Sequence, residues 1–180
     1  NKPNQDGVSG GLKASFESRD LVVAGASKKV TLAQVLVGEV WLCGGQSNMA
    51  MTLRSTVNRD LEIGSADFQA IRFLRVPLIS RGTPQVDLPT PEPKAGEGNW
   101  QLATADNVGN CTGVGFHFAK VLHQMLKVPI GLVDVSWGGT MAQHWVAQEN
   151  LKPIPEMTPY FDQYAARLKQ WNKWGGEQGA

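Results

Sequence analysis

The nine residues Trp41-Leu-Cys-Gly-Gly-Gln-Ser-Asn-Met49 are the most informative stretch of this chain. They end a strand-like apolar run that begins at Val35 and stops at two glycines. Glycine permits backbone conformations that a β-carbon forbids, and it leaves room for a substrate to reach a hydroxyl and nearby backbone N–H groups. The stretch therefore predicts that Ser47 is a nucleophile presented in a tight turn, although a serine in such a turn is also a common helix cap.

A second strand candidate ends in the same way. The β-branched run Ile130-Gly-Leu-Val-Asp-Val-Ser136 continues directly into Trp137-Gly-Gly-Thr140. If the two strands are neighbours, both glycine turns face one crevice, since sites in parallel sheets form at the carboxyl ends of the strands. The backbone N–H groups of Ser47 and of Gly138 or Gly139 are then suited to stabilise the oxyanion that forms when a carbonyl is attacked.

Strand and helix patterns alternate along most of the chain. Strand candidates lie at 38–43, 71–76 and 130–136, and this alternation with helical stretches predicts an α/β fold with a parallel sheet and right-handed crossovers. The helices are expected at 57–65, 114–126 and 158–174, the last with Thr158 as its N-cap and Gly175-Gly176 as its end. Residues 77–99 are rich in proline and glycine and predict a long surface loop.

The most regular helix pattern runs from Val114 to Leu126. Its apolar residues recur at helical spacing and form one stripe of an amphipathic helix; they are Val114, Phe118, Val121, Leu122 and Met125. Upstream, residues 12–37 contain short β segments. We therefore predict two units, the end of a β-rich accessory unit over residues 1–37 and part of an α/β domain over residues 38–180.

Composition excludes several classes of protein. The formal net charge is +1, and no cluster of Lys and Arg is dense enough to predict a nucleic-acid partner. No apolar run approaches the roughly 18 residues needed to span a membrane. The two cysteines, Cys43 and Cys111, are too few for a disulfide scaffold and lack metal-ligand spacing. We expect Cys43 to be a buried free thiol, with a Cys43–Cys111 bridge left open.

Two motifs carry a resemblance to a known family. Val37-Gly-Glu-Val-Trp-Leu-Cys-Gly-Gly-Gln-Ser-Asn-Met49 resembles the signature of the sialate O-acetylesterase family, within the SGNH hydrolase superfamily. Val128-Pro-Ile-Gly-Leu-Val-Asp-Val-Ser-Trp-Gly-Gly-Thr140 resembles the second conserved segment of that family, and Gly113-Val-Gly-Phe-His-Phe-Ala119 is similar too. The chain departs from the family pattern at Gly44, where the family commonly has serine.

The resemblance implies a three-layer α/β/α fold and a serine esterase that removes acetyl groups from sugar hydroxyls, on sialic acid or on acetylated polysaccharide. Ser47 matches the nucleophile, and its N–H and the Gly138-Gly139 turn match contributors to the oxyanion hole. No metal or cofactor is implied, and a secreted, periplasmic or lysosomal location is expected. The residues expected to contact the sugar are Gln46, Asn48, Trp137 and His144. Trp145 is a further candidate for stacking on a sugar ring, with core packing as the alternative for any tryptophan.

The catalytic base is missing from this pattern. The family resemblance implies a histidine in an Asp-x-x-His segment, but none of the three histidines, His117, His123 and His144, follows an aspartate at that spacing. We therefore expect no histidine of this chain to hydrogen bond to Ser47, and we expect the base, its aspartate and a further oxyanion donor to come from the remainder of the esterase domain. The alternative is a non-catalytic carbohydrate-binding or scaffold protein that keeps the fold without the base.

Overall fold

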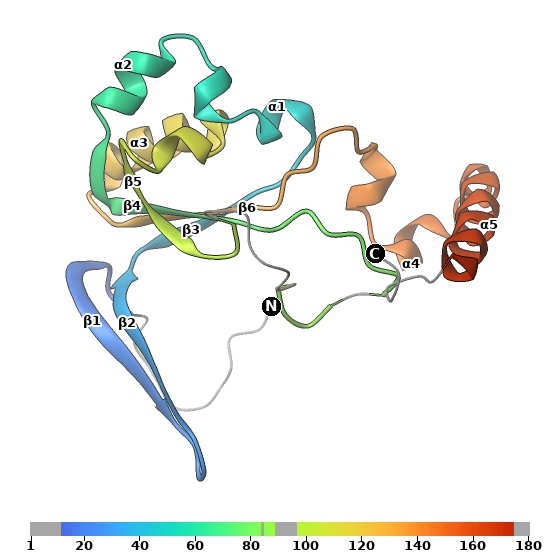
Figure 1. Cartoon of the computed structure of the whole chain (residues 1–180), viewed down its shortest axis with the longest axis horizontal. Coiled ribbons are helices and arrows are strands. Elements are labelled where there is room, and N and C mark those ends of the chain that lie inside the picture. The colour runs from blue at the N-terminus through green and yellow to red at the C-terminus, as the bar shows by residue number, and fades with distance from the viewer. Residues whose placement is uncertain (1–11, 84, 89–96, 175–180) are drawn as a thin grey trace.

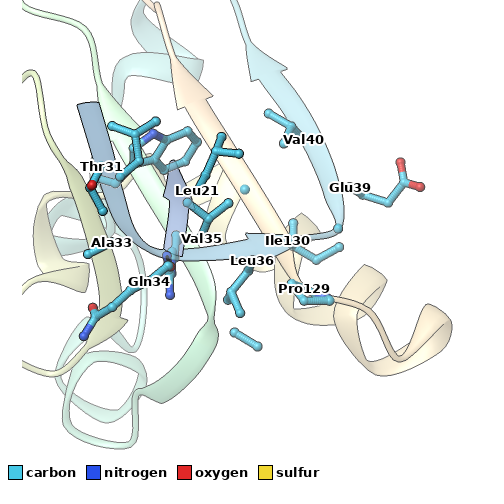
Figure 2. A pocket seen from close by; sticks show the side chains of 16 residues that line it. Leu21, Thr31, Ala33, Gln34, Val35, Leu36, Glu39, Val40, Pro129 and Ile130 are labelled. Carbon is cyan, nitrogen blue, oxygen red and sulfur yellow. Dashed lines mark hydrogen bonds between the residues drawn. The ribbon is translucent and has the colours of Figure 1, made fainter. Parts of the chain in front are cut away.

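The computed structural model describes residues 12–83, 85–88 and 97–174. The chain begins there with a hairpin of two antiparallel strands, β1 (Ser15–Ala24) and β2 (Lys29–Val37), which form a sheet of their own (Figure 1). Residues of the hairpin and of all four strands of the main sheet line an apolar cavity of about 600 Å³ (Figure 2). The boundary between an accessory unit and an esterase domain at residues 37 and 38 stays a prediction.

The main sheet has four strands in the order β3-β6-β4-β5. They are β3 (Glu39–Cys43), β6 (Ile130–Asp134), β4 (Asp67–Arg75) and β5 (Trp100–Thr104). β6 pairs in parallel with both β3 and β4, as the alternating pattern predicts. The three predicted strands are thus parallel, but the sheet as a whole is mixed, because a fourth strand that the sequence did not predict, β5, runs antiparallel to β4. An antiparallel return needs no crossover helix, and the described residues between β4 and β5 form none.

Three helices gather on one side of this sheet (Figure 1): α1 (Ser47–Ala50), α2 (Arg59–Gly64) and α3 (Gly113–Leu126). A 3₁₀ turn at Leu53–Ser55 lies between α1 and α2, and a second at Val108–Asn110 lies between β5 and α3. After β6 come a 3₁₀ turn at Ala142–Trp145, α4 (Gln148–Leu151), another 3₁₀ turn at Pro155–Met157 and α5 (Thr158–Lys173). None of the described helices is long and apolar enough to cross a membrane.

The predicted helices at 57–65, 114–126 and 158–174 are confirmed, with one correction at an end. Met157, not Thr158, is the N-cap of α5, because the 3₁₀ turn before it runs straight into the helix. The predicted stop at Gly175-Gly176 lies outside the described residues. Of the predicted loop at 77–99, residues 77–83 and 85–88 form neither helix nor strand, while residues 84 and 89–96 are not described.

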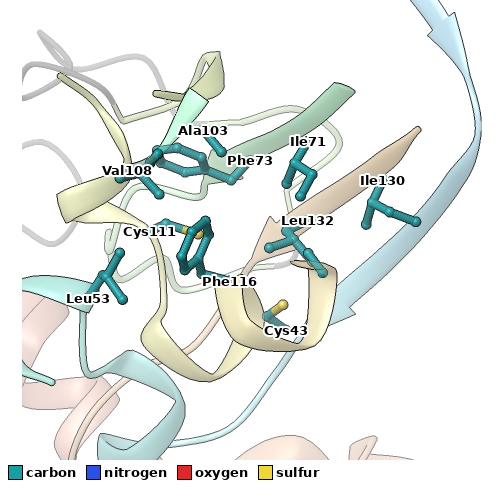
Figure 3. Packing of buried hydrophobic residues seen from close by; sticks show 12 residues of the cluster. Cys43, Leu53, Ile71, Phe73, Ala103, Val108, Cys111, Phe116, Ile130 and Leu132 are labelled. Carbon is teal, nitrogen blue, oxygen red and sulfur yellow. The ribbon is translucent and has the colours of Figure 1, made fainter. Parts of the chain in front are cut away.

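The hydrophobic core lies between α3 and the sheet (Figure 3). Phe116 and Leu132 are fully buried there, next to Cys43 at the end of β3. Small residues of α3 allow this close approach: a Cβ added at Gly115 would lie 3.1 Å from Cys43 Sγ. The side of α3 that faces the core is therefore Gly115, Phe116 and Ala119.

The apolar stripe predicted for this helix is largely exposed instead. Val114, Phe118, Val121 and Met125 all lie at the surface, and Leu122 is half-buried. Both cysteines are free and buried, which confirms the expectation for Cys43 and shows that it forms no bridge with Cys111.

Candidate active site

The turn after β3 is built around glycine and a side-chain cap. Gly45 has φ +142°, a left-handed conformation that favours glycine. Gln46 then caps the short helix α1, whose first residue is Ser47. The backbone N–H of Ala50 donates to Gln46 O over 2.9 Å, and that of Met51 donates to Ser47 O over 3.0 Å. This geometry leaves Gln46, Ser47 and Asn48 exposed at the carboxyl end of β3.

The Gln46 side chain holds both polar groups of Ser47. Gln46 Oε1 accepts from Ser47 N over 2.9 Å and from Ser47 Oγ over 2.8 Å. Because a backbone N–H can only donate, the atom that accepts from it must be the amide oxygen, which fixes the orientation of this amide. The hydroxyl proton of Ser47 therefore points at an amide oxygen, and the same oxygen covers the serine N–H.

The turn after β6 lies directly beside this one. In register, Cys43 of β3 and Arg75 of β4 both align with Asp134 at the end of β6. Trp137 N donates to Gly45 O over 2.9 Å, which ties the second turn to the first. A Cβ added at Gly138 would lie 3.9 Å from Ser47 Cα. The two turns that the sequence singles out are thus neighbours, and Gly138 is in contact range of Ser47.

The start of the second turn is fixed by a buried polar pair. Asp134 Oδ1 accepts from Ser136 N over 3.0 Å and from the Ser136 hydroxyl over 2.5 Å, and both residues are almost completely buried. Burying two polar side chains is tolerated because each satisfies the other. After this anchor the chain emerges, so that Trp137, Gly138 and Gly139 are exposed. Gly139 has φ +80°, again a conformation that favours glycine.

Thr140 and Trp145 close the second turn. Thr140 Oγ1 donates to Trp137 O over 2.7 Å and accepts from Trp145 Nε1 over 2.9 Å. The Trp145 ring lies against the first turn, with Cζ3 3.4 Å from the position of a Cβ added at Gly44. A larger side chain at position 44 would therefore press on this ring.

None of the three histidines, all within the described residues, hydrogen bonds to Ser47. His123 Nδ1 lies 2.7 Å from Val128 O. His144 Nδ1 accepts from Met141 N over 3.0 Å, and its ring centroid lies 6.0 Å from that of Tyr160. His117 is exposed on α3. The structure therefore brings together Ser47, Gln46, Asn48, Trp137, Gly138 and Gly139, and it leaves the serine without a base from the described part of the chain.

Comparisons with known proteins assign this chain to a family. No protein-family model matches the sequence. The chain is 37% identical over 124 residues to the sialate O-acetylesterase of Mus musculus and 36% identical over the same length to that of Homo sapiens. Each alignment covers 66% of this chain but only 22% and 23% of those relatives. The chain belongs, as a partial match, to the sialate O-acetylesterase family.

A solved structure supports this family and the mixed α/β fold. The crystal structure of a carbohydrate acetylesterase from Xanthomonas citri superposes with a TM-score of 0.66 and 36% sequence identity. The match covers 73% of this chain and 29% of that one. This chain thus spans less than a quarter of the length of the curated sialate O-acetylesterases it matches.

Sequence reasoning missed two polar anchors of the site, Asp134 and Thr140. Asp134 and Ser136 are separated by one residue at the end of an apolar strand. An aspartate and a serine at that spacing, inside an otherwise apolar run, could have indicated that the two side chains are buried and bind each other. Thr140 lies before the 3₁₀ turn, which begins only at Ala142. Its bridging role appears only once Trp137 and Trp145 are placed in space, since nothing local indicates the contact.

Proposed function

We propose that this chain carries the nucleophile and part of the oxyanion hole of a carbohydrate O-acetylesterase. The observation that supports it is the contact between the Ser47 turn and the Gly138 turn at the carboxyl ends of two neighbouring parallel strands. Both turns are exposed, so that an ester can reach the serine hydroxyl. The relatives are sialate O-acetylesterases, and that activity, removal of acetyl groups from sialate, gives the class of ester.

The reaction would proceed in two halves. Ser47 Oγ attacks the acetyl carbonyl carbon while its proton passes to a histidine base, and the carbonyl oxygen becomes an oxyanion. The oxyanion would accept from Ser47 N and from the Gly138-Gly139 turn; one well-placed donor of this kind is worth about 3 kcal/mol. The bond to the sugar oxygen then breaks, and that oxygen takes the proton. Water hydrolyses the acetyl-serine, releases acetate and restores the hydroxyl.

The Gln46 side chain must move for this to happen. Its amide oxygen accepts from both the N–H and the hydroxyl of Ser47, the two groups that attack and oxyanion binding require. We infer that the arrangement is a resting one, which substrate replaces by offering its carbonyl oxygen to Ser47 N. Gln46 is then free to contact the sugar, together with Asn48, Trp137 and His144.

The base, its aspartate and the second half of a three-layer domain would come from sequence outside this chain. Two observations support that part of the proposal. The hydroxyl of Ser47 has no histidine partner among the described residues. β3 is an edge strand of the described sheet and exposes Val40 and Leu42, which are 66% and 70% accessible. An exposed apolar edge is a surface on which further structure pairs.

The test uses the gene product that contains this chain, with p-nitrophenyl acetate and O-acetylated sialic acid as substrates. We expect Ser47→Ala to reduce turnover to the uncatalysed rate, while Ser55→Ala, which changes an exposed serine of the neighbouring 3₁₀ turn, keeps it. A fluorophosphonate should label Ser47, as peptide mass spectrometry would show. Full activity in Ser47→Ala would exclude the serine mechanism.

The alternative is a carbohydrate-binding protein that has lost catalysis. The hydrogen bonding of Ser47 to Gln46, rather than to a base, is the observation that favours it. Sugar binding without turnover in the complete gene product, together with absence of fluorophosphonate labelling, would establish this alternative. Turnover of acetylated xylan but not of acetylated sialic acid would keep the chemistry and change the substrate.

A further inference from the structure

The two glycine turns of the candidate site are held together by a closed ring of contacts. Trp137 N donates to Gly45 O in the first turn, and Trp137 O accepts from the Thr140 hydroxyl. The same hydroxyl accepts from Trp145 Nε1, and the Trp145 ring returns to the first turn at Gly44. Each contact joins one turn to the other or closes the second turn on itself.

Such a ring matters because the segment it encloses is intrinsically mobile. Gly138 and Gly139 have no side chains to hold them, and consecutive glycines have access to more backbone conformations than any other pair of residues. An oxyanion donor is effective only when it is fixed before the charge develops. The Asp134–Ser136 pair anchors the start of the turn, and its far end needs a second anchor.

We propose that Thr140 and Trp145 are positioning residues that hold the Gly138-Gly139 turn against Ser47. Thr140 is half-buried, and its hydroxyl uses both its proton and a lone pair within the ring, over 2.7 Å and 2.9 Å. The Trp145 ring packs against the first turn at Gly44 and holds it in place. This inference rests on the proposed esterase function for its effect on catalysis, but the contact it describes can be measured independently.

The test compares Thr140→Val with Thr140→Ser. Valine keeps the shape of threonine and removes the hydroxyl, so that both hydrogen bonds are lost; serine keeps the hydroxyl and both bonds. With p-nitrophenyl acetate, which has no sugar to stack on Trp145, we expect Thr140→Val to lower kcat by between about tenfold and a hundredfold with little change in KM. Thr140→Ser should restore kcat to within about threefold of wild type. Trp145→Phe, which keeps a ring but loses the indole N–H, should fall between the two.

A second readout does not depend on turnover. Hydrogen exchange of the Trp137 amide, followed by NMR, reports the bond to Gly45 O that ties the turns together. We expect exchange to be faster in Thr140→Val than in wild type and Thr140→Ser, at equal Tm. If the gene product has no esterase activity, the proposed function fails and exchange alone decides the positioning role. Equal exchange and equal kcat in Thr140→Val and Thr140→Ser would overturn the inference.

Discussion

Helix α3 has two apolar faces that meet different surroundings. On the inner face Phe116 is fully buried against the sheet, and Ala119 beside it is also fully buried. On the outer face Phe118 is 42% exposed and Met125 is 74% exposed. The outer face continues onto the edge strand, because the rings of Trp41 and Phe118 meet edge to face at 5.0 Å. The core of the described residues thus lies on one side of the sheet, while a second apolar surface of this chain is left exposed.

The inner face should carry most of the stability. Phe116→Ala removes a fully buried ring and leaves a cavity in the core, so we expect the free energy of unfolding to fall by about 3–5 kcal/mol. Phe118→Ala, two residues along the same helix, removes an exposed ring that contacts Trp41 and should cost about 1 kcal/mol. Urea denaturation of the two variants measures the difference. Equal decreases in the free energy of unfolding would contradict this prediction, because they would mean that the outer face of α3 is as well packed as the inner face.

The inner side could be predicted only in outline. The apolar runs at 38–43, 71–76 and 130–136 predicted three parallel strands because buried strands read as continuous apolar segments. The strand at Trp100–Thr104 was missed, since it follows a proline-rich segment that indicates only a loop. The apolar stripe of α3 predicted the wrong buried face. The residues that let the helix approach the sheet are the small Gly115 and Ala119, and a pattern based on large apolar residues does not include them.

The site was more predictable than the core. A serine after two glycines at the end of a strand, and a second glycine turn, indicated two neighbouring turns before any geometry was known. The contact of Gln46 with Ser47 was not predictable, because a glutamine side chain can reach many partners. The bridge from Thr140 to Trp145 joins residues whose meeting depends on how the chain bends after β6.

Two adjacent residues of β3, the buried Cys43 and the exposed Leu42, allow the buried and exposed sides to be compared by thiol reactivity. Burial, with Asp134 nearby as a smaller cause, raises the pKa of Cys43 to about 11. Leu42 beside it is 70% exposed, so a thiol placed there by Leu42→Cys should keep an ordinary pKa. At pH 8 we expect Ellman's reagent to label Leu42→Cys at least about 100-fold faster than native Cys43, with the labelled site read by mass spectrometry.

The same pKa shift has a consequence for stability. Because the folded state holds the Cys43 proton more tightly than the unfolded chain does, the unfolded chain ionises first as pH rises. The free energy of unfolding should therefore fall from the usual cysteine pKa up to pH about 11, and Cys43→Ala should remove this part of the decrease. Rapid labelling of native Cys43 at pH 8 would show that the end of β3 opens to solvent. Cys43 would then not be protected in the way that its burial predicts.

The smallest effect is expected at the border between the two faces of α3. Lys120 Nζ lies 2.6 Å from Glu62 Oε2, linking α3 to α2, and 5.3 Å from the centroid of the buried Phe116 ring. The hydrogen bond from Lys120 holds the pKa of Glu62 below its ordinary value. Glu62→Gln should lower the free energy of unfolding by about 0.5–1 kcal/mol at pH 7, the range of partly exposed ion pairs.

The sign of the pH dependence makes this prediction specific. A carboxyl whose pKa is lowered on folding contributes stability above its unfolded pKa and loses that contribution as pH falls through its folded pKa. Wild type and Glu62→Gln should therefore converge in acid and differ at neutral pH, in urea denaturation at low salt. Asp60→Asn is the matched control, because Asp60 is 96% exposed at the side chain and, within the described residues, forms its ion pair with the adjacent Arg59 at 3.6 Å. If Glu62→Gln has no larger effect than Asp60→Asn, the Lys120–Glu62 pair contributes no more to stability than an exposed pair does. The stabilising interactions of α3 would then lie on its inner face, at Phe116 and the core residues it contacts.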